Sequence, residues 1–371
     1  MKKIKRFLML SAVGLSLLLA GCSTPVDLRD RAIVQAMGID YENGEYKITL
    51  QEYMPKGGAK SGDSTEGSEN IYVTSSGKTL FEALKNAEAK DGNQIFYGHS
   101  RVYIIGKKAA EQGLSQIIEF MNSNYQLSLN SAVMLAEDSA QEILQKRIFM
   151  GVVPDISVER IEGCGKAPDA AVIDVLREIY NLDGTCCLPL ISPDGKEEVK
   201  IEECVVFREH KPLIKLNDEE TMGYTWLNGK ISDAVMIAQE QNQNVSVNIV
   251  SNDTSLEIAT GDEQIFLNVF VKAKGNVSEI GIIDNVQIKE EYIKNIEAEI
   301  EKQIKEQVKK AFNRVVTQES CDMFYIKQRL KNTDKSMYQK LKDEPLSSWL
   351  PQTKLNVTAD FSIRHSGVQV R

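Results

Sequence analysis

The clearest periodic segment of the chain lies near its C-terminal end. Over residues 289–316, apolar residues recur at steps of three and four, with Glu, Lys and Gln between them. The recurring positions are Ile293, Ile296, Ile300, Ile304, Val308, Phe312 and Val315. This spacing predicts a long amphipathic helix. Its steps follow the period of a straight helix more closely than a sustained heptad, so we expect it to pack on its own sheet. A coiled-coil or partner-binding surface is the alternative.

The segments around this helix alternate between apolar and polar residues, which predicts strands. The last strand is the most regular, with Leu355, Val357, Ala359, Phe361 and Ile363 on one face. Earlier strands are predicted near residues 200–207, 211–216, 223–227, 246–250, 254–260 and 264–275. The predicted C-terminal body is therefore a mostly antiparallel sheet covered by the long helix.

The N-terminal part mixes strands and helices. Strands over 32–39 and 46–53 flank the turn Glu42-Asn43-Gly44, and shorter strands follow at 71–75, 102–105 and 131–135. Helices are predicted over 78–91, 109–121 and 140–146, the last capped by Ser139. This order predicts an α+β fold with several domains. Residues 22–150 form the predicted N-terminal domain, proline-rich 151–198 a connector with a helix at 170–179, and 199–371 the C-terminal domain.

The first 22 residues carry the pattern of an export signal. Lys2, Lys3, Lys5 and Arg6 precede an apolar run of about 13 residues, which is too short to span a bilayer. Leu19-Ala20-Gly21 then places small residues directly before Cys22. This pattern predicts a lipoprotein signal peptide over 1–21 and lipidation of Cys22, which would anchor the chain outside the cytoplasmic membrane. An ordinary secretory peptide with a chance cysteine is the alternative.

Charge and composition narrow the class of partner. The whole chain carries a net charge of −9, and without residues 1–21, which hold four cations and no acid, the charge is −13. Such an acidic chain is unsuited to nucleic acid, and an anionic bilayer would repel its body. We therefore expect the lipid to do the anchoring. No apolar run after Cys22 is long enough for a transmembrane helix.

Five further cysteines leave their redox state open. They are Cys164, Cys186, Cys187, Cys204 and Cys321. They lack C-x-x-C spacing and a nearby histidine pair, so we expect no metal site. Buried structural thiols are the favoured interpretation, and a disulfide from Cys164 to Cys186 or Cys187 is the alternative.

The sequence offers no evident catalytic constellation. Gly163-Cys164-Gly165-Lys166 resembles the end of a phosphate loop, but Arg160 and Ala167 stand where that loop needs Gly and Ser or Thr. The histidines His99, His210 and His365 are isolated, and we expect His99 to be a satisfied structural residue before the strand at 101–105. We therefore predict a protein that is not an enzyme and uses no cofactor.

Four stretches resemble the Ger(x)C family, the lipoprotein subunit of GerA-type nutrient receptors in bacterial endospores. They occur in the family's order and span essentially the whole mature chain. The first is Ala32-Ile33-Val34 with Gly38-Ile39-Asp40 and Tyr46-Lys47-Ile48-Thr49; the second is Gly77-Lys78-Thr79-Leu80-Phe81-Glu82-Ala83 with Tyr97-Gly98-His99-Ser100-Arg101-Val102. The third is Glu220-Thr221-Met222-Gly223-Tyr224-Thr225-Trp226-Leu227-Asn228-Gly229, and the fourth is Cys321-Asp322-Met323-Phe324 with Trp349 and the last strand.

Two departures from the family pattern affect local turns. Ser23-Thr24-Pro25 replaces the Trp-Asp that often follows the lipidated cysteine. The family run D-i-f-G-f-G becomes Asp322-Met323-Phe324-Tyr325-Ile326-Lys327 and loses both glycines.

The resemblance implies a subunit without enzymatic activity, needed for the response to germinants. It would be anchored on the outer face of the spore inner membrane and partnered by integral-membrane A and B subunits. Whether it contacts the nutrient stays open. A solute-binding lipoprotein of an ABC-type transporter is the main alternative, although its paired βαβ lobes are missing from the pattern at 200–285. An enzyme acting on the cell wall is a third possibility.

Overall fold

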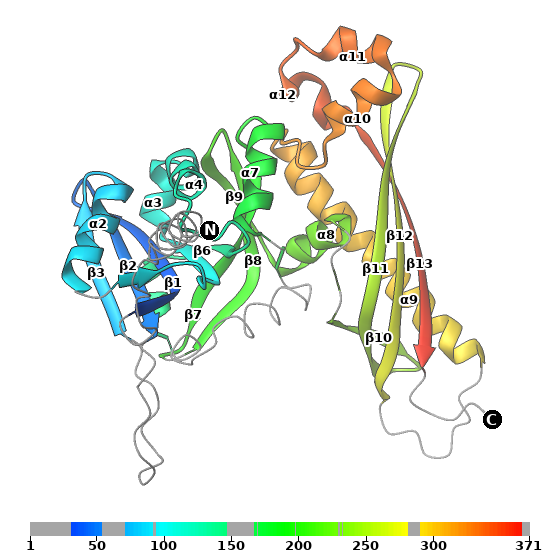
Figure 1. Cartoon of the computed structure of the whole chain (residues 1–371). Coiled ribbons are helices and arrows are strands. Elements are labelled where there is room, and N and C mark those ends of the chain that lie inside the picture. Colours follow the sequence, from blue (N-terminus) through cyan, green and yellow to red (C-terminus); the bar gives the residue numbers. More distant parts are fainter. Residues whose placement is uncertain are drawn as a thin grey trace, which may run out of the picture.

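The computed structural model describes residues 31–53, 71–91, 94–146, 167–168, 170–196, 198–228, 231, 233–280 and 290–365. These residues form two α+β bodies, one rounded and one elongated, that lie beside each other (Figure 1). The predicted α+β class is confirmed.

The rounded body is built on a sheet that has nine strands among the described residues. Its order is β3-β2-β1-β5-β6-β7-β8-β9, with β4 also paired to β1. The pairs β1–β5, β5–β6 and β6–β7 are parallel, whereas β2–β3 and β8–β9 extend the two sides in antiparallel fashion. The strands are β1 (Arg31–Glu42), β2 (Glu45–Tyr53), β3 (Ile71–Gly77), β4 (Gln94–Phe96), β5 (Val102–Ile105), β6 (Ala132–Ala136), β7 (Cys186–Asp194), β8 (Glu198–Arg208) and β9 (Lys211–Leu216).

Helices cover both faces of this sheet. One face carries α2 (Leu80–Asp91), α3 (Lys107–Gln112), α4 (Leu114–Ser123) and α7 (Val172–Asn181), and the other carries α5 (Ala140–Leu144). The Asp40 carboxylate holds α5 in place, because it accepts the backbone N–H groups of Ala140 (2.8 Å) and Gln141 (2.9 Å). Gly106 must be glycine, since a Cβ there would lie 2.0 Å from Asp40 Oδ1. Asp40 of the first family stretch therefore fixes the start of helix α5.

The elongated body wraps a four-stranded sheet around one long helix. The sheet has the order β10-β11-β12-β13, with only β12–β13 parallel among the described strands. Its strands are β10 (Ala234–Glu240), β11 (Gln243–Gly261), β12 (Gln264–Ile280) and β13 (Lys354–His365). Helix α9 (Glu290–Phe312) continues through a π-helical turn, η3 (Asn313–Gln318). The predicted helix over 289–316 and its packing on its own sheet are confirmed, with residue 289 outside the described residues.

Short helices lie at the far end of the elongated body, shown in orange to red in Figure 1. They are α10 (Ile326–Thr333), α11 (Lys335–Leu341), α12 (Leu346–Trp349) and the 3-10 turn η4 (Leu350–Gln352). They connect α9 to β13. The sequence pattern did not predict them, because each is too short to show a repeated apolar stripe.

The boundary of the two sheets differs from the predicted domain boundary. Helix α7 and strand β7 lie within the predicted connector 151–198, yet they belong to the first sheet and its helical layer. Strands β8 and β9, predicted in the C-terminal domain, also extend the first sheet. The physical reason is that strand β7 contains Pro189 and Pro193, which made a buried strand look irregular.

Three predicted elements change type or length. Residues 223–227 are not a strand but belong to helix α8 (Asp218–Asn228). The helix predicted over 109–121 is two helices, because Gly113 adopts a φ of +124° between them. The strands predicted at 246–250 and 254–260 are one strand, β11, that continues across a register shift.

Side chains of α9 reach both edge strands of the second sheet. Glu297 accepts the Ile363 backbone N–H at 2.8 Å, and Glu301 accepts that of Phe361 at 3.1 Å. On the opposite edge, Gln303 Nε2 donates to the Ile237 carbonyl at 2.9 Å. These bonds occupy edge groups that another strand could otherwise pair with.

Glu52 is a buried acid near the end of β2 in the first sheet. Among the described residues, neither of its carboxylate oxygens has a hydrogen-bond partner. Burial, assisted by the nearby charge of Asp91, raises the pKa of Glu52 from 4.5 to about 8. The native protein therefore holds this proton at pH values where the unfolded chain has released it.

We predict that Glu52→Gln stabilises the protein at high pH. The pKa of Glu52 is higher in the folded protein than in the unfolded chain. The resulting contribution of Glu52 to the free energy of unfolding is therefore complete below pH 4.5 and is lost as the pH rises to about 8. At about pH 8 the free energy of unfolding of Glu52→Gln should exceed that of the wild type by roughly 3 kcal/mol, and below pH 4.5 the two values should match. Urea denaturation at both pH values measures the difference. Glu45→Gln, at an exposed position of the same strand, is the control and should show no such trend.

Candidate functional site

Some predicted positions fall outside the described residues. They include the predicted lipidation site Cys22, the segment 163–166 and Cys164. His99 lies in the turn before β5, as expected, and its side chain is exposed. Its ring meets the Phe96 ring edge to face, with centroids 5.5 Å apart.

The third family stretch forms α8, which lies between the two bodies. Its first turn is a reciprocal cap: Glu220 N–H donates to Asn217 Oδ1, and Asn217 N–H donates to a Glu220 carboxylate oxygen, both at 3.0 Å. The Thr221 hydroxyl bonds the Leu216 carbonyl at 3.3 Å, which ties the helix to the end of β9. The motif therefore starts a helix directly where the first sheet ends.

Helix α8 crosses α9 at the closest approach that a glycine permits. A Cβ on Gly223 would lie 2.0 Å from the carbonyl oxygen of Gln307 and 3.0 Å from Ala311 Cβ. One turn later, Trp226 is fully buried and its Nε1 donates to Gln307 Oε1 at 2.9 Å. The glycine and the tryptophan of the family stretch thus both serve this crossing.

The crossing lies inside one hydrophobic core that joins the two sheets. Cys204 and Val206 of β8 belong to the same buried cluster as Trp226 of α8, Ile304 of α9 and Val269 of β12. The two bodies are therefore not separated by a solvated linker. We call the α8–α9 crossing and its surrounding core the seam.

The described cysteines also lie in and beside the seam. Cys186, Cys187, Cys204 and Cys321 are buried free thiols, as predicted. Burial raises the pKa of the Cys186 and Cys187 thiols well above the ordinary value, and raises that of Cys321 to about 12. All three are protonated near neutral pH, so these thiols pack as small apolar groups and are poor nucleophiles.

The fourth family stretch turns the chain after α9. The Asp322 carboxylate accepts the backbone N–H groups of Ile326 (2.7 Å) and Lys327 (2.9 Å) at the start of α10. Burial raises the pKa of Asp322, and these backbone N–H groups oppose that shift. Tyr325, which replaces the first family glycine, has a φ of +58°, in the left-handed region that glycine favours. The turn is therefore kept although the glycine is lost.

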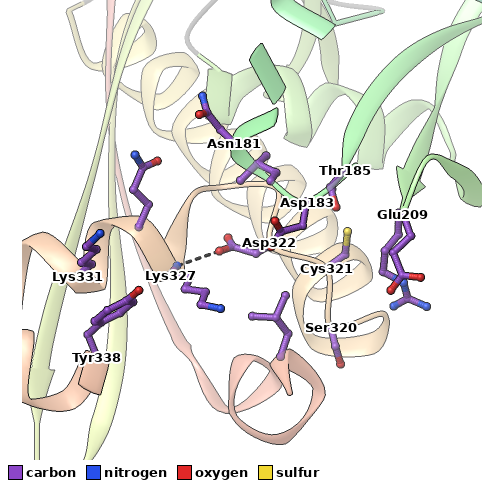
Figure 2. A pocket seen from close by; sticks show the side chains of 14 residues that line it. Asn181, Asp183, Thr185, Glu209, Ser320, Cys321, Asp322, Lys327, Lys331 and Tyr338 are labelled. Atoms are coloured by element: carbon purple, nitrogen blue, oxygen red, sulfur yellow. Dashed lines mark hydrogen bonds between the residues drawn. The ribbon is translucent and has the colours of Figure 1, made fainter. Parts of the chain in front are cut away.

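A pocket of about 430 Å³ opens beside this turn, between the two bodies (Figure 2). The rounded body contributes the α7–β7 turn and the β8–β9 turn, and the elongated body contributes the residues after η3 and the short helices. Its lining residues are Asn181, Leu182, Asp183, Thr185, Arg208, Glu209, Ser320, Cys321, Asp322, Lys327, Gln328, Lys331, Tyr338 and Leu346. The sequence did not predict this pocket, because its walls come from four separate segments.

The pocket contains charged groups but no assembled catalytic group among its described residues. The Asp322 carboxylate accepts hydrogen bonds from backbone N–H groups, and the Cys321 thiol stays protonated because burial raises its pKa. Arg208 Nη1 donates to the Glu319 carbonyl at 2.8 Å, a bond that crosses between the bodies. The described residues also form no group of three His, Cys, Asp or Glu that could hold a metal ion. The geometry fits a polar contact region between the bodies.

Comparison with protein families gives two adjacent matches. Residues 25–193 match the family model described as spore germination protein N-terminal domain. Residues 202–367 match the model described as spore germination B3/GerAC-like, C-terminal. Together they cover most of the chain.

Similar proteins and one solved structure span nearly the same length. Spore germination protein KC of Bacillus subtilis (strain 168) is 22% identical over 95% of this chain and 94% of its own. Spore germination protein GerQC of Bacillus cereus is 23% identical over 95% and 97%. The crystal structure of the GerBC protein superimposes with a TM-score of 0.57 at 18% identity, covering 88% of this chain and 96% of that one. That likeness shows a shared fold.

We predict that Gly223→Ala weakens the whole protein through the seam. The added methyl would meet the α9 backbone, which cannot move aside as a side chain could. The free energy of unfolding should fall by roughly 2 kcal/mol or more. Urea denaturation measures it. Gly261→Ala is the matched control, because nothing lies within 4 Å of that Cβ position, and its effect should be small. Equal effects of the two variants would contradict the assigned role of Gly223.

Proposed function

Because the chain belongs to the GerAC/B3-like family of spore germination proteins, we propose that it is the lipid-anchored C subunit of a nutrient germinant receptor. The observation that carries the proposal is the match to both family models in order, together with a lipoprotein signal that ends at Cys22. In this role the protein is a structural subunit, without enzymatic activity.

The anchor sets how the subunit meets its partners. Lipidation of Cys22 would hold the body on the outer face of the spore inner membrane, where two or three acyl chains bind a bilayer stably. Confinement to this surface raises the effective concentration of the subunit near integral-membrane A and B subunits. None of the described helices has the combination of length and apolar character needed to cross a membrane.

The seam supports a bracing or coupling role. Since one core joins both sheets, a force applied to the rounded body is transmitted to the elongated body through packed side chains. Such a unit can hold the external surfaces of two membrane partners in a fixed relation. The Asp322 carboxylate is bound by backbone N–H groups and the Cys321 thiol is protonated. Both residues therefore fit a structural role better than a role as base or nucleophile in hydrolysis.

We predict that Cys22→Ala releases the protein from its receptor. The test is affinity purification from spore inner membrane in mild detergent, comparing the wild type with Cys22→Ala. The wild type should recover two multi-span proteins of the A and B type. The variant, deprived of its acyl chains, should recover much less of both. Ser23→Ala, which changes the neighbouring residue and keeps the thiol, serves as the matched control and should behave as the wild type.

Other outcomes reject the proposal. Recovery of an ABC permease with the wild type would favour the solute-binding class of lipoprotein. Failure to recover any membrane partner, in preparations where the wild type is present and folded, would remove the receptor assignment.

A further inference from the structure

The length of the N-terminal tether limits which part of the rounded body can meet a bilayer. Nine peptide units separate Cys22 from Arg31, the first residue of β1. Fully extended, they span about 30 Å, and as a relaxed coil roughly 17 Å. If Cys22 is anchored as proposed above, the start of β1 must stay within this distance of the bilayer surface. This limit rests on the proposed function.

Strand register identifies the edge of the sheet nearest this tether. Ile33 pairs with Phe96 of β4, and the Arg101 backbone N–H donates to the Gln35 carbonyl at 2.8 Å. Ile71 of β3 pairs with Glu52, which pairs in turn with Val34. The turn 96–101 and the start of β3 therefore lie beside the first residues of β1. We call this surface the tether edge.

The opposite end of the sheet lies farther from the residue where the tether joins β1. Gly77 pairs with Tyr46, which pairs with Tyr41, and α2 begins shortly afterwards with Leu80 and Phe81. Tyr41 lies ten residues along β1 from Arg31, which is about 33 Å in a strand. With β1 upright on the bilayer, Phe81 could touch the lipid only if the tether ran back along the strand at or beyond full extension.

The tether edge displays side chains suited to a membrane interface. Phe96 is 38% exposed, although its ring is held on one side by the turn. A Cβ on Gly98 would lie 2.8 Å from Phe96 Cζ, so the glycine lets the ring fold onto the turn, while His99 contacts it edge to face. Arg101 is also exposed in this turn. An aromatic ring beside an imidazole and a guanidinium is a combination that favours the headgroup region of a bilayer.

These contacts give a role to two residues of the second family stretch, Gly98 and His99. Packing in the core does not explain why Gly98 and His99 occur together, because both residues are exposed. Their shared contact is the Phe96 ring. With Phe96 they form a partly apolar surface beside the first residues of β1.

We propose that the tether edge, comprising Ile71, Phe96, His99 and Arg101, rests on the headgroup region of the bilayer and orients the subunit there. The acyl chains supply the affinity, and the tether edge fixes which face looks toward the membrane. The other end of the first sheet, with Phe81, then faces away from the lipid.

Tryptophan placed at the two ends of the sheet tests this orientation. Full-length lipidated Phe96→Trp and Phe81→Trp proteins are bound to phosphatidylglycerol–phosphatidylcholine vesicles carrying a doxyl quencher near the headgroup. The native Trp226 and Trp349 are 0% and 6% exposed, so the introduced residue reports the change. The emission of the introduced residue, taken as variant minus wild type, should fall by about half for Phe96→Trp, as expected for a ring at headgroup depth, and should stay unchanged for Phe81→Trp. Phe81 is itself 56% exposed, which makes it a matched control.

A second reporter guards against local damage at Phe96. Ile71 is 37% exposed at the same edge, so Ile71→Trp should be quenched like Phe96→Trp. Cys22-dependent vesicle binding without quenching at either position would overturn the orientation and leave the proposed anchor intact. Equal quenching of Phe81→Trp would overturn it too, since the body would then lie flat. Loss of vesicle binding by the wild type would instead reject the lipid anchor.

Discussion

The close crossing of α8 and α9 is the contact on which the rest of the structure depends. Helix α8 is the first element after β9, and it carries the chain from one sheet to the other. Its glycine, Gly223, allows the two helix backbones to touch, and Trp226 fills the space beside Gln307. The surrounding core includes residues of β8 as well as of β12, so part of each sheet is buried at this crossing.

Helix α9 also bonds the two edge strands of the elongated sheet. Glu297, Glu301 and Gln303 bond backbone groups of β13 and β10 on opposite edges. A long sheet with open edges invites pairing with other chains, and polar side chains on those edges reduce this risk. One face of α9 therefore packs in the apolar core of the elongated body. Polar side chains beside that face bond the backbone of the two edge strands.

Local patterns predicted much of the fold and failed at helix α8 and strand β7. The hairpin of β1 and β2, the strand at 102–105, the cap at Ser139 and the long helix were correct. The long helix has the clearest pattern, because its buried residues recur on one face. Helix α8 was predicted as a strand since Gly223 to Leu227 are buried on all sides, which leaves no helical stripe to detect. Strand β7 was missed because its prolines resemble a loop. The seam and the pocket beside it depend on contacts between distant segments, which no local pattern encodes. The family stretches include Asp40, Gly223 and Asp322, and the structure shows that these residues hold the chain in shape.

The seam makes the two bodies one cooperative unit. Hydrogen–deuterium exchange measured by mass spectrometry can test this by comparing amides of α8 with those of the two sheets. We expect α8, the centre of α9 and strand β8 to exchange together, at the slow rate of global unfolding. Fast exchange of α8 while both sheets stay protected would contradict it, because the bodies would then be independent domains joined by a labile helix.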